Sequence, residues 1–222
     1  EAAGMRFPLT LGGKGSATIG GLAMLLAFFA GTLIGIFAAL RQNRLADHAL
    51  MGVGMLGISI PNFVIAPLLI LGLAIYGGWL PASGWDWTWQ RGVLPVVTLA
   101  LPAIAYIARL TRGSMIEVLH SNYIRTARAK GLPERVVILR HAMPNAILPI
   151  IAMIGIDIGI FMGGIVVVEG VFGWPGIGQL AWQAIQRVDI PIIMGVTLVS
   201  ACAIVLGNLL ADLITPLINA RI

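Results

Sequence analysis

The chain has 222 residues, of which 59% are hydrophobic and 10% are charged, and its formal net charge is +5. A soluble domain carries about a quarter charged residues, because its surface must face water. Most of this chain therefore cannot face water, which excludes a soluble enzyme, a disordered tail and a disulfide-linked secreted domain. The composition predicts an integral membrane protein.

Five runs with few or no charges are long enough to cross a bilayer, whose hydrocarbon core takes about 20 residues of helix. Irregular backbone is unstable against lipid, so each run is expected to be a helix and the fold class to be all-α. Pro61 and Pro67 are expected to kink the second span. The 222 residues are expected to form one polytopic membrane domain, with spans at about 15–40, 51–76, 92–111, 142–168 and 190–217.

Basic residues in the connecting segments set the expected orientation. The link 41–48 and the segment 109–140 are rich in arginine, and the latter holds seven of the fourteen lysines and arginines. The positive-inside rule places both segments in the cytoplasm. Five spans then put the N-terminus outside and Arg221 inside. The two outer connections carry one arginine each: 77–91, which also holds a cluster of tryptophans, and 169–189.

The start of the chain is unusual for this orientation. It opens with Glu1 rather than Met and has no cleavable signal pattern, although its N-terminus would need to be exported. A sixth helix, running from the inside to the outside and lying upstream of this sequence, is therefore expected.

The cytoplasmic segment 112–141 is about 30 residues long, which is more than a turn between two helices needs. Ser121 or Asn122 is expected to cap a short helix. Gly131 can end that helix in a left-handed conformation, and Pro133 can open the next helix at its first position. Small residues in the short helix suit a partner groove, whereas its basic residues suit anionic lipid. The residues alone leave docking and lipid contact open.

The same segment carries a family resemblance. Four stretches of sequence are involved: RGSMIE at 112–117, SNYIRTARAKGLP at 121–133, HAMPNAILP at 141–149 and VEGVFGWPGIGQL at 168–180. They resemble the EAA loop and its surroundings in permease subunits of binding-protein-dependent ABC importers, and most closely the oligopeptide/dipeptide permease branch. Arg125 and Thr126 stand where the general pattern has Glu and Ala. The form TARAKGL that results is similar to the one in the peptide branch. The similarity extends over nearly the whole chain, from about Phe7 to Arg221.

The resemblance implies a type I ABC importer-like permease fold with a cytoplasmic coupling helix. In such permeases the EAA helix sits in a cleft of a separate ATPase subunit. Ten residues are accordingly expected to contact an ATPase: Tyr123, Ile124, Arg125, Thr126, Ala127, Arg128, Ala129, Lys130, Gly131 and Leu132.

The resemblance also implies a function and a set of partners. The chain would be the membrane-spanning subunit, and not an enzyme, of an importer that moves oligopeptides or dipeptides by alternating access. Its partners would be a second related permease in a heterodimer, two ATPase subunits, an extracytoplasmic binding protein, the peptide and membrane lipid, with no nucleic acid. The implied location is the bacterial cytoplasmic (inner) membrane.

Nucleotide chemistry is expected in the partners rather than in this chain. The stretch GGKGS at 12–16 lacks the full phosphate-loop pattern, and no strand precedes it. The three histidines have no metal-ligand spacing. No cofactor is therefore expected here, and ATP and Mg would bind the partner ATPase subunits.

Two acidic residues are candidates for the substrate pathway. Asp157 lies in the middle of the fourth span, where a charge costs about 2.5–3.5 kcal/mol on insertion scales. It either faces the translocation path, near a peptide amino terminus, or is protonated or hydrogen-bonded and holds helices together. Glu169, at the outer end of the same span, either caps a helix or gates the path.

Other functions remain as alternatives. Within the importer class, the substrate could be a nickel chelate, glutathione or another small solute. An ion-coupled secondary transporter would need several buried ionisable groups at mid-membrane, and Asp157 alone meets that description. An intramembrane Ser/His protease, using Ser114 with His120 or His141, is disfavoured because these residues fall at the basic cytoplasmic face.

Overall fold

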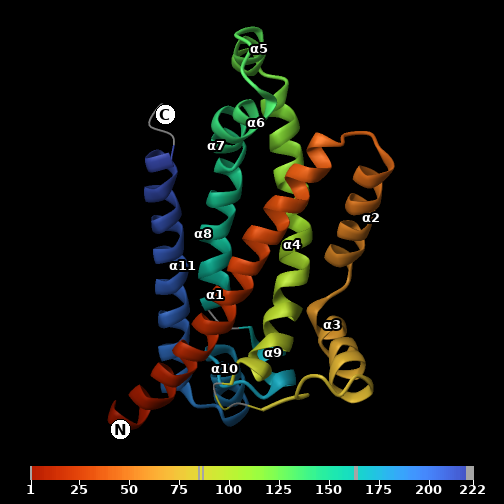
Figure 1. Ribbon diagram of the computed structural model, residues 1–222. Coiled ribbons are helices and arrows are strands. Elements are labelled where there is room, and N and C mark those ends of the chain that lie inside the picture. The colour runs from red at the N-terminus through yellow and green to blue at the C-terminus, as the bar shows by residue number, and fades with distance from the viewer. Residues whose placement is uncertain (1, 85, 87, 163–164, 219–222) are drawn as a thin grey trace.

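The computed structural model describes residues 2–84, 86, 88–162 and 165–218, and over these residues the regular structure is entirely helical (Figure 1). The two long helices α1 (Ala2–Leu40) and α4 (Trp89–Leu119) pack against each other along much of their length. Helix α11 (Ile190–Ile218) packs along α8 (Leu148–Met162). Arg221, which was expected inside, lies outside the described residues.

Two glycines allow α1 to approach α4 closely. A Cβ atom at Gly31 would lie 2.8 Å from the Ile107 side chain, and one at Gly35 would lie 2.5 Å from the Thr111 side chain. Gly31 and Gly35 are four residues apart, so both face the same neighbour. Small residues at this spacing are typical of helix pairs in membranes, where close backbone packing replaces the hydrophobic effect.

The expected second span, 51–76, is not one kinked helix. It is divided into α2 (Leu45–Ser59), α3 (Asn62–Leu69) and the π-helical η1 (Ile70–Tyr76). The segments before and after the break differ in direction by 102°. Pro61 causes the break, because a residue before proline is pushed out of the helical region, and Ile60 is extended with φ −91° and ψ 117°.

The expected fourth span, 142–168, is also divided. It consists, with the residues before it, of α6 (Glu134–Val136), η2 (Val137–Ala142), α7 (Met143–Ala146), α8 and α9 (Val166–Phe172). A bend of 43° separates α7 from α8. Ile165 is non-helical, with φ −113° and ψ 76°, so α9 is a separate short helix and not the end of the span.

Among the residues that the structure describes, three helices are long and apolar enough to cross a membrane, and the number rises to five if each bent pair counts as one span. The three are Gly13–Leu40, Trp89–Leu119 and Ile190–Leu210. Figure 1 shows the short helix α5 (Asn122–Ala129) at one end of the bundle and α9 and α10 (Ile177–Arg187) at the other. The N-terminus lies at the α10 end, as the expected orientation requires.

Candidate functional site

The predicted short helix is α5, and its two ends are fixed by the backbone. Ser121 occupies the N-cap position, but its hydroxyl donates to the carbonyl of Val118 at 2.6 Å instead of capping α5. Gly131 has φ +76°, the left-handed conformation predicted for it, in which a side chain would be strained. Pro133 stands at the N-cap of α6 and not at its first helical position. The result is a short helix with a sharp turn on each side.

One face of α5 is buried against the rest of the bundle. Ile124 is fully buried and Ala127 is 7% exposed. Both belong to an apolar cluster with residues of α1, α4, η2 and α7: Ala39, Met115, Val137, Ala142 and Ala146. This cluster attaches α5 to the helices that lead into and out of the cytoplasmic segment.

The other predicted contact residues lie at the surface. Leu132 is half-buried, and seven of the ten are exposed: Tyr123, Arg125, Thr126, Arg128, Ala129, Lys130 and Gly131. The helix thus presents a mostly polar and basic face, while Ile124 and Ala127 support it from within. Any contact with another subunit falls to the exposed residues.

An ion pair closes the turn after α5. The Arg128 guanidinium donates to Glu134 through Nη2 at 2.6 Å and through Nε at 3.2 Å. Its hydrogen bond to the Glu134 carboxylate raises the pKa of Arg128. Both side chains are about half exposed, so the pair contributes about 0–1 kcal/mol to stability. It connects α5 to α6 across Gly131.

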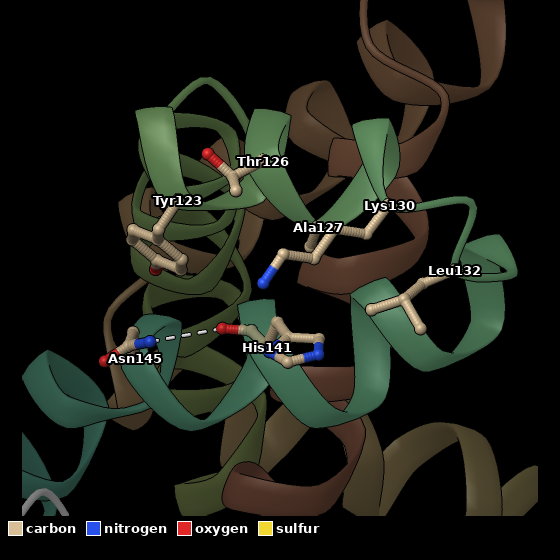
Figure 2. Close-up of a pocket in the computed structure, with 7 residues that line it drawn as sticks. All are labelled: Tyr123, Thr126, Ala127, Lys130, Leu132, His141 and Asn145. Carbon is tan, nitrogen blue, oxygen red and sulfur yellow. Dashed lines mark hydrogen bonds between the residues drawn. The ribbon is translucent and has the colours of Figure 1, made fainter.

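A groove of about 500 Å³ runs beside α5 (Figure 2). Its lining residues come from α5 and the turn after it, and from η2 and α7: Tyr123, Thr126, Ala127, Lys130, Leu132, His141 and Asn145. In Figure 2, Lys130 reaches across the groove toward His141. Asn145 donates from Nδ2 to the backbone carbonyl of His141 at 3.1 Å. Neither His141 nor Asn145 was predicted as a site residue, although both lie in the stretch HAMPNAILP that carries the resemblance.

A buried ion pair that no pattern in the sequence predicted supports the cytoplasmic end. Asp47 in the first turn of α2 is fully buried. It accepts hydrogen bonds from Arg112 Nε at 2.5 Å and Nη2 at 2.7 Å, and from the backbone N–H of Asn43 at 3.0 Å. This bidentate arrangement ties α2 to α4. The two residues are 65 apart in the chain. Of the two, only Arg112 lies in a stretch that carries the family resemblance, RGSMIE.

At the outer end, Glu169 caps a helix. Its carboxylate accepts hydrogen bonds from the Ser16 hydroxyl at 2.7 Å, the Ile165 N–H at 3.2 Å and the Gln179 N–H at 2.8 Å. The Ser16 oxygen in turn accepts from the N–H of Ile177 at 2.9 Å. Glu169 is 2% exposed and lies at the positive N-terminal end of α10. This geometry favours the capping alternative over a place on the substrate pathway.

Asp157 differs from Glu169. It lies in α8, is half-buried, and makes no hydrogen bond or ion pair with any residue that the structure describes. Among the described residues, Asp157 therefore makes no polar contact that would hold two helices together. It remains the acidic candidate for contact with a solute.

Residues 31–222 match the family described as "Binding-protein-dependent transport system inner membrane component". The chain belongs to this family. The permease is 44% identical over 209 residues to the oligopeptide transport system permease protein OppB of Escherichia coli (strain K12). That alignment covers 93% of this chain and 68% of OppB. It is 40% identical over 200 residues to the glutathione transport system permease protein GsiC of the same strain, in an alignment that covers 90% of this chain and 65% of GsiC.

A solved structure supports the fold. The permease superimposes with a TM-score of 0.80 on a chain of an inward-facing MetNI methionine ABC transporter, covering 97% of this chain and 98% of the other. The identity is 17%, so this likeness concerns the fold alone. The resemblance stated from the sequence and the all-helical importer fold are confirmed.

The family defines what the permease is in outline. It is a multi-pass inner membrane subunit of a bacterial binding-protein-dependent ABC importer, and it is not itself the catalytic subunit. Membership implies an ATPase and a binding protein as partners.

Proposed function

We propose that the permease forms the membrane pathway of an importer for oligopeptides or dipeptides, which an external binding protein delivers. The observation that carries this proposal is the 44% identity to an oligopeptide permease over 93% of the chain. Glutathione is the second candidate solute, because a glutathione permease is 40% identical over 90% of the chain. Glutathione is itself a small peptide, so both candidates belong to one chemical class.

The proposed assembly pairs this chain, as a single membrane domain, with a second related permease and two ATPase subunits. ATP and Mg would bind in those ATPase subunits. The exposed face of α5 would dock in a cleft of one of them. The difference in burial between the two faces of α5 supports this docking. Ile124 and Ala127 are buried in the bundle, whereas the basic Arg125 and Lys130 are exposed and free to contact another subunit.

We propose that α5 works as a lever. The hydroxyl of Ser121 fastens its start to the end of α4, and the Arg128–Glu134 pair fastens its end to α6. Ile124 lies in the apolar cluster shared with α4, η2 and α7. Closure of the ATPases on ATP would therefore displace α4 and the η2–α8 segment together. Such coupled displacement is what alternating access between inward-open and outward-open states requires.

Asp157 is the residue that we propose for the pathway. It is half-buried and, among the described residues, it has no hydrogen-bond or ion-pair partner. A carboxylate inside a membrane domain is costly unless it meets a cation, and the amino terminus of a peptide would be one.

The test is reconstitution of the permease with its co-purified partners in vesicles. Uptake of a labelled tripeptide and of labelled glutathione is measured with ATP and the binding protein present. Peptide uptake that is lost when 123–132 is scrambled, in a protein that still inserts, is the expected result. Asp157→Asn should lower peptide uptake without changing assembly. If glutathione alone is taken up, glutathione and not a longer or different peptide is the solute. Uptake that is driven by an ion gradient without ATPases would overturn the importer proposal.

A further inference from the structure

A second groove, of about 650 Å³, lies on the outer surface of the bundle, between α1 and the η2–α7 segment. Its walls are apolar over almost the whole length, with Phe28, Leu33 and Leu40 from α1 facing Leu139 and Ile147. The side chains that form the walls are open to the surroundings: Leu33 is 68% exposed and Leu139 is 63% exposed. Apolar surface this open needs an apolar cover.

The length and orientation of the groove match one leaflet of a membrane. From Phe28 to Leu40, α1 rises about 18 Å, at 1.5 Å per residue. Half of a hydrocarbon core of about 30 Å is about 15 Å. The groove thus runs from the cytoplasmic end of α1 to about mid-membrane, as an acyl chain of the inner leaflet does.

The cytoplasmic end of the groove is basic. Arg135 lines it there, is exposed, and makes no ion pair with any described residue. Arg112 and Arg128, in contrast, are each paired with a carboxylate. Arg41 directly follows Leu40 and lies with its guanidinium carbon 4.3 Å above the centre of the Phe37 ring. Of these arginines, Arg135 lines the groove itself and has no ion-pair partner among the described residues, and guanidinium binds phosphate with paired hydrogen bonds.

We infer that this groove binds a phospholipid of the inner leaflet that has an anionic headgroup, with its phosphate on Arg135 and an acyl chain between α1 and η2. The cytoplasmic leaflet carries such lipids, and a basic residue near its surface contributes about 1 kcal/mol of attraction. A second permease subunit is the rival occupant. Lipid is favoured because Arg135, which has no carboxylate partner among the described residues, lies at the headgroup end, and because the apolar walls extend to the depth of one leaflet.

The bound lipid would lie against the element that carries motion from α5 into the membrane. Ile36 and Ile138, which line the groove, also pack against the apolar cluster that contains Ile124 of α5. Occupancy of the groove would therefore stiffen the η2 segment. This consequence rests on the proposed lever role of α5, whereas lipid binding itself does not.

The experiment is native mass spectrometry of the permease, purified with its partners from nanodiscs of phosphatidylcholine mixed with phosphatidylglycerol. The expected result is retained phosphatidylglycerol that falls about fivefold in Arg135→Gln, the factor that corresponds to about 1 kcal/mol. Leu33→Trp, which fills the groove, should also lose the lipid. Arg187→Gln, an exposed arginine at the end of α10, is the matched control and should retain it.

A photo-crosslinking residue in place of Leu139 distinguishes the two occupants. Crosslinks to phosphatidylglycerol support the proposal. Crosslinks to a second permease subunit overturn it, and so does phosphatidylglycerol occupancy that is unchanged in both groove variants. Because the readout is bound lipid, failure of this proposal is distinguishable from failure of the proposed solute or of ATPase docking.

Discussion

The two ends of the permease hold their short helices by different means. At the outer end, α10 is fixed by the buried carboxylate of Glu169, which accepts hydrogen bonds from Ser16 and from two backbone N–H groups. A side chain at Gly176 would clash with that carboxylate, so the joint has no spare room. At the cytoplasmic end, α5 is held by the buried side chains of Ile124 and Ala127 and by an exposed ion pair.

This difference indicates different roles for the two ends. A buried polar network fixes one arrangement, because each broken hydrogen bond leaves an unpaired group in a low dielectric. Apolar anchors and an exposed ion pair tolerate small shifts, so α5 can adjust to another subunit without detaching. Damage at the outer joint should therefore appear as lost stability, and damage at α5 as lost coupling.

The largest expected effect concerns the buried ion pair between Asp47 and Arg112 at the cytoplasmic end. Arg112→Ala leaves the fully buried Asp47 carboxylate without its partner, and we expect a loss of about 3 kcal/mol in the free energy of unfolding. Thermal unfolding in detergent, followed by tryptophan fluorescence, measures it. Arg109→Ala is the matched control, since Arg109 is an exposed arginine of the same helix. Equal stability of the two variants would contradict the rigid role of the pair.

The outer joint should show the next largest loss. Glu169→Ala removes the acceptor for three donors, and each unpaired buried group costs about 1–3 kcal/mol unless water reaches it. We expect about 2–3 kcal/mol of destabilisation in the same unfolding assay. Glu117→Ala, which removes an exposed carboxylate near the cytoplasmic end of α4, should change stability little. A stable Glu169→Ala variant that has lost uptake would favour a gating role instead.

A smaller loss of stability with a large loss of coupling is expected at the turn after α5. Gly131→Val places a β-branched residue at φ +76°, a strain of about 1–2 kcal/mol. ATP hydrolysis by the reconstituted complex should continue while peptide uptake falls. Gly131→Asn is the control, because asparagine adopts the left-handed conformation more readily. Unchanged uptake in Gly131→Val would refute the lever proposal.

The smallest effect on stability should come from the exposed ion pair. Arg128→Gln removes an interaction that contributes at most about 1 kcal/mol, and added salt should reduce even that difference. Its uptake should fall more than its stability, if the pair sets the angle of α5. The double variant with Glu134→Gln completes a mutant cycle. A coupling energy of zero for uptake would show that the two residues act independently.

Local patterns predicted the cytoplasmic segment better than the membrane spans. Gly131 ends α5 in the left-handed conformation, because a glycine followed by Leu-Pro is a local signal. Pro61 was expected only to kink a helix, but it separates two helices by 102°. The direction of the chain after a break depends on what the next segment packs against. In this permease α3 packs against α4 and α9, and no local pattern encodes those contacts.

Composition, the length of the apolar runs and motifs continuous in the chain were enough to predict the membrane class, the helical fold and the family, and they also predict an orientation. Which polar groups contact one another became visible in the folded bundle. Asp47 and Arg112 are 65 residues apart, and Ser16 and Glu169 are 153 apart. The groove that we propose to bind lipid likewise lies between two segments distant in the chain, α1 and η2. Such pairings arise from packing between distant helices, whose partners are set by the energy of the whole bundle.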